Sequence, residues 1–205
     1  MGTRNLTCVV LNKQIRVAQY CQWDGYPGGQ GKTVFNFIKN NSLRKFKQRV
    51  GSLQQISKEE VHAKWKECGA DDSGWVGLDV SKKMEEKYPH LNRDCGAQVL
   101  ELILNKKISE VNLSTDFAAD SLFCEWAYVI DLDRKILEVY RGFVTNPHNE
   151  GRFANLSLAQ EHRGESKYYP IKLLLEIPFK KLPATADEFV TLCNNALPPE
   201  ERDED

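Results

Sequence analysis

Two pairs of adjacent β-prone segments constrain the fold of this chain more than any other feature. Leu6 to Leu11 is an apolar run, and after Asn12-Lys13 a second run, Gln14 to Trp23, has apolar residues at alternate positions. Residues 122–131 alternate in a similar way, and a polar turn leads into the run from Ile136 to Phe143. A period of two residues is typical of strands, and a short connection joins antiparallel neighbours. The sequence therefore predicts two β-hairpins.

Helical patterns fill the segment between the two hairpins. Apolar residues recur at helical spacing from Val34 to Ile38, and Asn40-Asn41-Ser42 separates this helix from a second one at Leu43 to Val50. Ser57-Lys-Glu-Glu60 matches a capping box, which predicts the start of a third helix. The buried stripe of that helix is expected at Val61, Trp65 and Cys68.

Two more helices are predicted before the second hairpin, and a strand and a last helix are predicted after it. Ser81 is expected to cap a short helix ending at Tyr88, and Asn92 is expected to cap another. Ile171 to Ile177 is typical of a strand, and Thr185-Ala-Asp-Glu188 is a second capping box that opens the last helix. The order is hairpin, helices, hairpin, strand and helix, without the regular β-α-β alternation of a parallel sheet.

The fold expected from this order is α+β. Its mainly antiparallel sheet consists of the two hairpins plus a further strand, and several helices pack on it. We expect residues 1–197 to form a single domain, because a chain of 205 residues is close to one domain length. Residues 198–205 are too charged to pack and are expected to form a disordered acidic tail.

Composition excludes several classes of protein and hides a local imbalance of charge. Hydrophobic residues make up 41% and no run approaches a membrane span, so membrane, collagen and coiled-coil proteins are excluded. The formal net charge is −1, yet residues 200–205 hold five acidic residues and one basic residue. Residues 25–58 hold seven basic residues and no acidic one. A basic block and an acidic tail therefore cancel in the total.

The cysteines and histidines give no sign of a metal or a disulfide framework. None of the six cysteines forms a C-x-x-C pair, and the chain opens without an apolar signal segment. We therefore expect reduced thiols, a cytoplasmic location, no metal and no cofactor. The histidines lack metal-ligand spacing and are expected on the surface. They are His62, His90, His148 and His162.

The segment from Gln22 to Thr33 has the least ordinary composition. A phosphate-binding loop of the G-x-x-x-x-G-K-[ST] type would need glycine at position 26, where Tyr26 stands, so that interpretation fails. The segment still places Trp23 and Asp24 beside flexible backbone at a strand-to-helix junction. One hypothesis is a ligand site in which Trp23 and Tyr26 bind substrate and Asp24 is catalytic. The alternative is that both aromatic rings fill the core and Asp24 only starts a turn.

Three other residues are candidates for the same site. Glu125 lies in the predicted strand between Cys124 and Trp126, where it faces either solvent or a polar cavity that would make it a catalytic proton carrier. Asp94 is a candidate for substrate binding, with helix capping as its alternative role. Arg4 precedes the first strand, and we expect it to bind substrate or to pair with an acid such as Asp24.

The basic block has two interpretations. Its residues are either the solvated face of helices or a surface that binds the phosphates of RNA. The candidate tRNA-binding residues are Lys32, Lys39, Arg44, Lys45, Lys47 and Arg49.

Two blocks of the sequence resemble a family of small fungal proteins. The first comprises Met1–Thr7, Val17–Tyr20, Gln22–Pro27 and Gly29–Gly31, and the second comprises Tyr88–Asp94, Gly96-Ala97 and Leu100–Leu102. The chain also resembles the fungal arginine-containing cyclodipeptide synthases. That resemblance implies an enzyme that takes aminoacyl groups from charged tRNAs, one of them arginyl, and joins them into a diketopiperazine. It transfers no catalytic residue. The alternatives are a non-catalytic ligand- or protein-binding module that uses the Trp23–Gly31 loop, and an amide-bond hydrolase or transferase.

Overall fold

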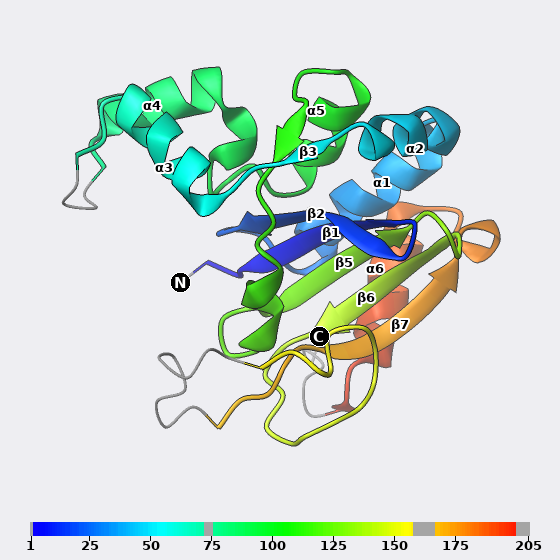
Figure 1. Ribbon diagram of the computed structural model, residues 1–205. Helices are drawn as coiled ribbons and strands as arrows, with labels where there is room; N and C mark the ends of the chain where they lie inside the picture. Colours follow the sequence, from blue (N-terminus) through cyan, green and yellow to red (C-terminus); the bar gives the residue numbers. More distant parts are fainter. Residues whose placement is uncertain (1, 72–75, 158–166, 200–205) are drawn as a thin grey trace.

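The computed structural model describes residues 2–71, 76–157 and 167–199, and its centre is a five-stranded sheet in the order β2-β1-β5-β6-β7 (Figure 1). β1 and β2 form the first hairpin, β5 and β6 form the second, and β7 adds to the edge of β6. The strands are β1 (Asn5–Leu11), β2 (Gln14–Cys21), β5 (Trp126–Asp131), β6 (Ile136–Arg141) and β7 (Lys172–Pro178). The predicted α+β fold and both hairpins are confirmed.

The two hairpins are joined through β1 and β5, which pair in parallel. Every other pairing in the five-stranded sheet is antiparallel. The parallel pair is possible because the long helical segment between β2 and β5 returns the chain to the end of the sheet from which β1 starts. The sheet is therefore mixed, although mainly antiparallel.

A layer of helices covers one face of the sheet. Val34 and Phe35 of α1, Phe46 of α2 and Phe189 of α6 belong to one buried cluster with strand residues such as Tyr128. Phe35 and Phe189 stack with ring centroids 5.1 Å apart, which ties α1 to α6. The helices of this layer are α1 (Lys32–Asn40), α2 (Leu43–Gly51), α5 (Val99–Leu104) and α6 (Ala186–Ala196).

A pair of helices, α3 (Lys58–Glu67) and α4 (Leu78–Lys87), lies beyond the β2 side of the sheet (Figure 1). The predicted capping box of Ser57 and Glu60 is confirmed, as is that of Thr185 and Glu188 at α6. The predicted buried stripe of α3 is wrong in part, because none of the residues of α3 is buried and only its C-terminal neighbour Cys68 is. This helix faces a cavity instead of the core.

Short elements connect these layers. Two strands, β3 (Gln54–Gln55) and β4 (Glu110–Val111), pair in parallel beside the helices. Single helical turns are η1 (Pro27–Gly31), η2 (Pro89–Leu91), η3 (Gly96–Gln98), η4 (Thr115–Ala119) and η6 (Phe179–Lys181).

Two predicted helix starts are wrong. α4 begins at Leu78, so the amide of Ser81 already bonds within the helix to the carbonyl of Gly77. Asn92 opens no helix, because its side chain accepts a hydrogen bond from the amide of Asp94 in a local turn.

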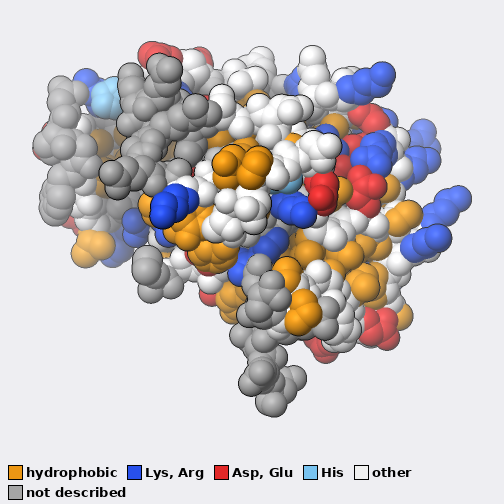
Figure 2. Space-filling view, turned by 90° about the horizontal axis from the view of Figure 1, so that it is seen from below, with side chains coloured by type: hydrophobic (Ala, Val, Ile, Leu, Met, Phe, Trp, Pro, Cys, Tyr) orange, Lys and Arg blue, Asp and Glu red, His pale blue; other side chains and the backbone are white. Residues whose placement is uncertain are grey.

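The other face of the sheet is covered by loops. Phe153 and Ile171 pack there against Cys8, Val129 and other strand residues. The view from below shows hydrophobic side chains of this side of the molecule around several Lys and Arg side chains (Figure 2). Part of the predicted long loop, residues 158–166, and most of the predicted acidic tail lie outside the described residues.

All six cysteines are buried and free. Burial raises the pKa of the Cys95 and Cys193 thiols to about 12. These thiols are therefore protonated at neutral pH and act as small core residues rather than nucleophiles.

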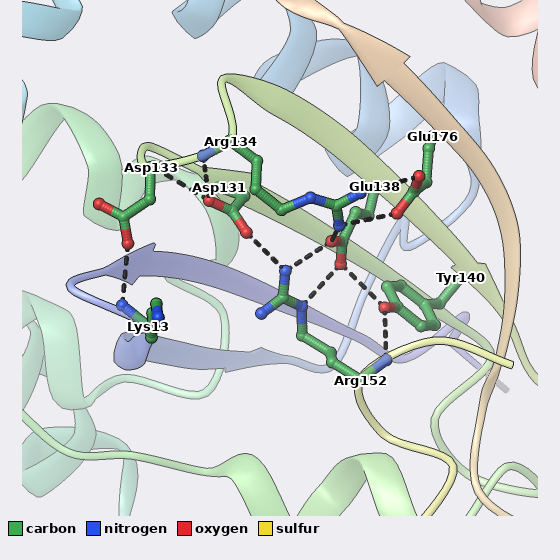
Figure 3. A network of polar contacts seen from close by, with 8 residues as sticks. All are labelled: Lys13, Asp131, Asp133, Arg134, Glu138, Tyr140, Arg152 and Glu176. Carbon is green, nitrogen blue, oxygen red and sulfur yellow. Dashed lines mark hydrogen bonds and ion pairs between the residues drawn. The ribbon is translucent and has the colours of Figure 1, made fainter. Parts of the chain in front are cut away.

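A buried polar network lies on the loop-covered face (Figure 3). Arg152 donates through Nη2 to Asp131 Oδ2 at 2.8 Å and through Nε to Glu138 Oε2 at 2.7 Å. The Tyr140 hydroxyl donates to the same Glu138 oxygen at 2.8 Å. The side chains of Asp131 and Glu138 are only 4% and 2% exposed. Arg152 thus neutralises two carboxylates that have almost no contact with water.

Replacing Arg152 should destabilise the fold strongly. Arg152→Met leaves Asp131 without its cation and Glu138 with only the half-exposed Arg134 at 3.2 Å, and we expect the free energy of unfolding to fall by about 3–5 kcal/mol. Urea denaturation followed by circular dichroism measures this change.

The matched control for this substitution is Lys172→Met. Lys172 pairs with Glu150 at 3.2 Å, and their side chains are 45% and 53% exposed. The loss there should not exceed about 1 kcal/mol. Equal losses for the two variants would contradict the role assigned to the buried network.

Candidate functional site

The end of the sheet at which β1 begins collects most of the candidate residues. Cys21, Asn5, Trp126, Arg141 and Lys172 lie opposite one another across the five strands. Segments that leave or enter the strands at this row must therefore lie close together. We call this row and the loops that flank it the motif end of the sheet.

Hydrogen bonds join the two sequence blocks at the motif end. The amide of Gly25 donates to the carbonyl of Thr3 at 2.8 Å, and the amide of Gln22 donates to the carbonyl of Arg93 at 3.0 Å. The side chain of Gln30 accepts from the amide of Ala97 at 2.8 Å. Segments near residues 3, 25 and 95 therefore form one structural unit.

The glycines of the Trp23–Gly31 loop serve close packing. A Cβ atom on Gly31 would lie 2.7 Å from the hydroxyl oxygen of Tyr128 and 2.8 Å from its ring. A Cβ atom on Gly29 would lie 2.1 Å from the carbonyl oxygen of Asp24. The Tyr128 hydroxyl donates to the carbonyl of Gly25 at 2.8 Å, so the loop is anchored on β5. These contacts explain why glycine stands at positions 29 and 31, so a bound phosphate is not needed to account for them.

Packing does not explain the three candidate residues of this loop. The Trp23 and Tyr26 side chains are 45% and 46% exposed, so the interpretation that they fill the core is wrong. Asp24 is exposed and has a φ of 55°, a left-handed conformation that is uncommon outside glycine. Its carbonyl accepts from the amide of Gln30 at 2.7 Å. Asp24 thus shapes the turn and also presents its carboxylate to solvent.

Arg4 and Glu125 meet at the motif end although they are far apart in sequence. Glu125 Oε1 accepts from the amide of Arg4 at 3.2 Å. The Arg4 guanidinium lies 4.5 Å from the centroid of the Phe123 ring, stacked on it rather than bonded to Asp24. Glu125 was expected inside a strand but precedes β5, because the side chain and carbonyl of Asp120 bind the amides of Leu122 and Cys124 in a turn.

Exposed aromatic rings concentrate at this end. In the part of the chain that the structure describes, the large exposed aromatic side chains all flank the motif end: Trp23, Tyr26, Phe123, Phe143 and Tyr169. Arg141 lies 4.8 Å from the ring centroids of both Trp126 and Phe143. The motif end therefore presents aromatic rings and arginine planes side by side.

Buried polar atoms without a partner also belong to the two sequence blocks. Within residues 2–71, 76–157 and 167–199, such side-chain atoms occur in Arg4, Asn5, Thr7 and His90. A buried polar group without a hydrogen bond costs free energy, so each one needs an explanation. Asn5 and Thr7 are fully buried within β1, whereas His90 lines a cavity in which a ligand could supply the missing bonds.

A cavity of about 750 Å³ lies between the end of β2 and the α3–α4 pair. Its apolar wall includes Val61, Trp65 and Leu78, and its polar wall includes Tyr20 and residues of the second block. Asp94 lines it, paired with Arg93 at 3.8 Å. The turn that follows Asp94, η3, has no side-chain cap. The cavity thus places a candidate substrate-binding residue beside the motif end.

His90, which was expected on the surface, lines this cavity and is only 4% exposed. Neither ring nitrogen has a hydrogen-bond partner, and Nε2 lies 3.8 Å from Glu110 Oε1. Burial lowers the pKa of His90, and the charge of Glu110 opposes that effect. The imidazole is therefore neutral at neutral pH. The turn of Pro89–Leu91 places the imidazole inside the protein. Sequence reasoning missed this burial, because the histidines show no metal-ligand spacing that would have marked His90.

Tyr20 lies at the junction of the cavity and the motif end. Its hydroxyl donates to Gln22 Oε1, and its ring makes an edge contact with Phe117 at 4.9 Å. Burial raises the pKa of the Tyr20 hydroxyl, while the charges of Arg4 and Arg93 lower it. Sequence reasoning missed Tyr20 because its position in a strand is ordinary.

The candidate tRNA-binding residues of the basic block form two groups in the structure, one with partners inside the fold and one around a surface depression. Lys32 pairs with Asp187 of α6 at 3.0 Å, and Lys39 donates to the carbonyl of Pro183 at 3.1 Å. Lys47 lies 3.5 Å from Asp133. These three lysines have partners within the fold and are less available to an external phosphate.

Other basic residues surround a shallow depression of about 510 Å³ between α2 and the end of α5. Lys45 and Arg49 of α2 line it together with Lys106. Arg44 is exposed on the same helix. We call this depression the α2–α5 basic depression.

Neither a metal cluster nor a membrane-spanning helix is found in the described ranges. No group of three or more His, Cys, Asp or Glu side chains there could hold a metal ion. None of the helices in those ranges has the length and apolar character needed to cross a bilayer. Comparisons with protein-family models, with curated proteins and with solved structures find no significant match to this chain.

Gly31→Ala should lower stability through overpacking. The new methyl group would collide with Tyr128, and we expect the free energy of unfolding to fall by about 1–3 kcal/mol. Gly28→Ala is the control, since its Cβ atom would lie 3.4 Å from the Tyr26 ring, an ordinary contact. A change within about 0.5 kcal/mol is expected there. Thermal unfolding of both variants measures the difference, and equal stability would contradict the packing role of Gly31.

Proposed function

We propose that this protein is a tRNA-dependent cyclodipeptide synthase that joins two aminoacyl groups, one of them arginyl, into a cyclic dipeptide. The observation that supports this most is the meeting of the two sequence blocks beside a cavity that holds carboxylates and a neutral imidazole. Both blocks carry the resemblance to the family of small fungal proteins. A cytoplasmic location, where charged tRNA is abundant, is part of the proposal.

The reaction needs positioning and proton transfer but no external energy source. The free amine of one aminoacyl group attacks the ester carbonyl of the second, forming a C–N bond and breaking the C–O bond to tRNA. The amine proton passes to a base and then to the released 3′ oxygen. A second attack of the same kind closes the ring and releases the other tRNA. Holding the two esters in one cavity supplies most of the acceleration that such a reaction needs.

Surfaces next to the cavity suit a tRNA substrate. Unpaired bases stack on aromatic side chains and on arginine planes, and the motif end presents both. Phosphates bind exposed lysines and arginines, as in the α2–α5 basic depression. Its candidate residues are Lys45 and Arg49, and the candidate Arg44 is exposed on the same helix.

The candidate site residues have distinct roles in this proposal. Trp23 and Tyr26 stack on the acceptor end of tRNA, and Arg4 helps to order it. The carboxylate of Asp94 binds the arginyl guanidinium, which carboxylates hold through paired hydrogen bonds. Asp24 and Glu125 move protons at the rim of the site.

Product analysis tests the proposal directly. The purified protein is incubated with total tRNA, arginine, arginyl-tRNA synthetase and each second amino acid with its own synthetase. We expect one arginine-containing diketopiperazine by mass spectrometry, and its loss when tRNA is digested beforehand. Absence of any cyclic dipeptide across all pairings would reject the synthase and favour a binding module that uses the exposed Trp23 and Tyr26.

Charge reversal in the α2–α5 basic depression should weaken tRNA binding. For Lys45→Glu with Arg49→Glu we expect an affinity loss of about tenfold or more, because two phosphate contacts become repulsive. The slope of log Kd against log salt concentration should fall by about two. Fluorescence anisotropy with labelled tRNA measures both quantities.

A control variant with the same change of charge is Lys83→Glu with Lys167→Glu. Both lysines are exposed and lie outside the basic depression. Their affinity and salt slope should stay close to those of the unchanged protein. Equal losses in the two double variants would show that net charge, and not the depression, governs binding.

A further inference from the structure

His90 is the buried group that the proposed roles leave unused. Its side chain is 4% exposed, lines the cavity, and has no hydrogen-bond partner at Nδ1 or Nε2. An imidazole in this state loses its bonds to water without replacement, at a cost of about 1–3 kcal/mol for each unsatisfied group. The unsatisfied ring lies at a cavity wall and not in the closed core.

The surroundings of His90 suit a neutral ring that can accept a proton. Nε2 faces Glu110, whose Oε1 lies 3.8 Å away and is held by Lys64 Nζ at 2.7 Å. A neutral imidazole has one nitrogen with a free lone pair, and neither ring nitrogen of His90 has a hydrogen-bond partner. Lys64 fixes the carboxylate and also discourages a permanent positive charge on His90. The ring is thus arranged as a proton acceptor.

One wall of the cavity offers apolar surface to a ligand. α3 contributes no buried residue and α4 contributes only Met84. Leu78 and Val76 on this wall are 83% and 36% exposed. Covering such side chains with the apolar part of a ligand is favourable.

The ligand chemistry follows from the two kinds of group in the cavity. The carboxylate of Glu85 lines it and attracts a cation. A neutral imidazole nearby can accept a proton from that cation. A primary ammonium group satisfies both conditions, whereas a guanidinium does not release its proton. The apolar side chains of Val61, Trp65 and Leu78 suit the hydrocarbon part of the same molecule.

We infer that the cavity binds the α-amino end of an aminoacyl ester and that His90 accepts the proton of its ammonium group. One N–H bond of the ammonium breaks, and its proton goes to the ring nitrogen of His90 that has a free lone pair and from there to solvent. The freed amine attacks the second ester, and as the C–N bond forms His90 accepts a second proton from the amine nitrogen. The imidazolium, stabilised by Glu110, gives this proton to the tRNA oxygen released when the C–O bond breaks. The identity of the ester rests on the proposed function, but the amine site is testable without it.

Binding of a small amine ester tests the site in the unchanged protein. The probe is leucine methyl ester, and N-acetyl-leucine methyl ester is the control that keeps the ester and lacks the amine. We expect saturable shifts of the His90 ring signals in ¹H–¹³C NMR spectra with the first compound only. The same shifts with both compounds, or none with either, would overturn the inference. This measurement needs no variant and no activity.

The product assay then separates this inference from the proposed function. His90→Gln should lower the rate of cyclic dipeptide formation about 100-fold or more, the usual contribution of a general base. The rate of the unchanged protein should rise with pH through the lowered pKa of His90, and the variant should lose this acidic limb. His62→Gln, on the exposed side of α3, is the control that keeps both.

Each outcome of these experiments has one meaning. Product formation with an unchanged rate and pH profile in His90→Gln would overturn the role of His90 and leave the synthase in place. No product from any tRNA pairing, with ester-induced shifts of His90 intact, would reject the synthase and keep the amine site. Should His90→Gln unfold, the NMR titration still decides.

Discussion

The parallel pairing of β1 with β5 is the constraint on which the site depends. It places Asn5 opposite Trp126, so that segments 121 positions apart in sequence meet at the motif end. The antiparallel hairpins then carry Cys21 and Arg141 to the same row. A loss of this pairing would separate the aromatic surface from the cavity.

The loop Trp23–Gly31 divides into a part that packs and a part that does not. Gly29 and Gly31 allow backbone and Tyr128 to approach closely, and Gln30 bridges to the second block. Trp23 and Tyr26 add little to the core because nearly half of each side chain is exposed. Large exposed aromatic side chains are unfavourable in water unless something covers them. Trp23 and Tyr26 are therefore the residues of this loop that remain available to a partner.

Local rules predicted the elements, and only the tertiary structure revealed the site. The hairpins and both capping boxes follow from periodicity and from short-range hydrogen bonds, so sequence is sufficient for them. The pairing of β1 with β5 depends on how a long helical segment returns, which no local pattern encodes. Glu125 precedes the strand that was predicted to contain it, because Asp120 accepts hydrogen bonds from the amides of Leu122 and Cys124 and forms a turn there. His90 has no sequence signal at all, since its burial depends on where α3 and α4 lie.

The buried carboxylates elsewhere in the molecule are paired, whereas the buried ring of His90 has no hydrogen-bond partner. Asp131 and Glu138 are also removed from water, yet both are paired with Arg152, and Tyr140 donates a further hydrogen bond to Glu138. The ring of His90 instead lies 3.8 Å from Glu110 Oε1, beyond hydrogen-bond distance. Lys64 holds that carboxylate back at 2.7 Å. The unsatisfied ring is thus maintained by a specific contact, which is the arrangement expected where a ligand completes the hydrogen bonds.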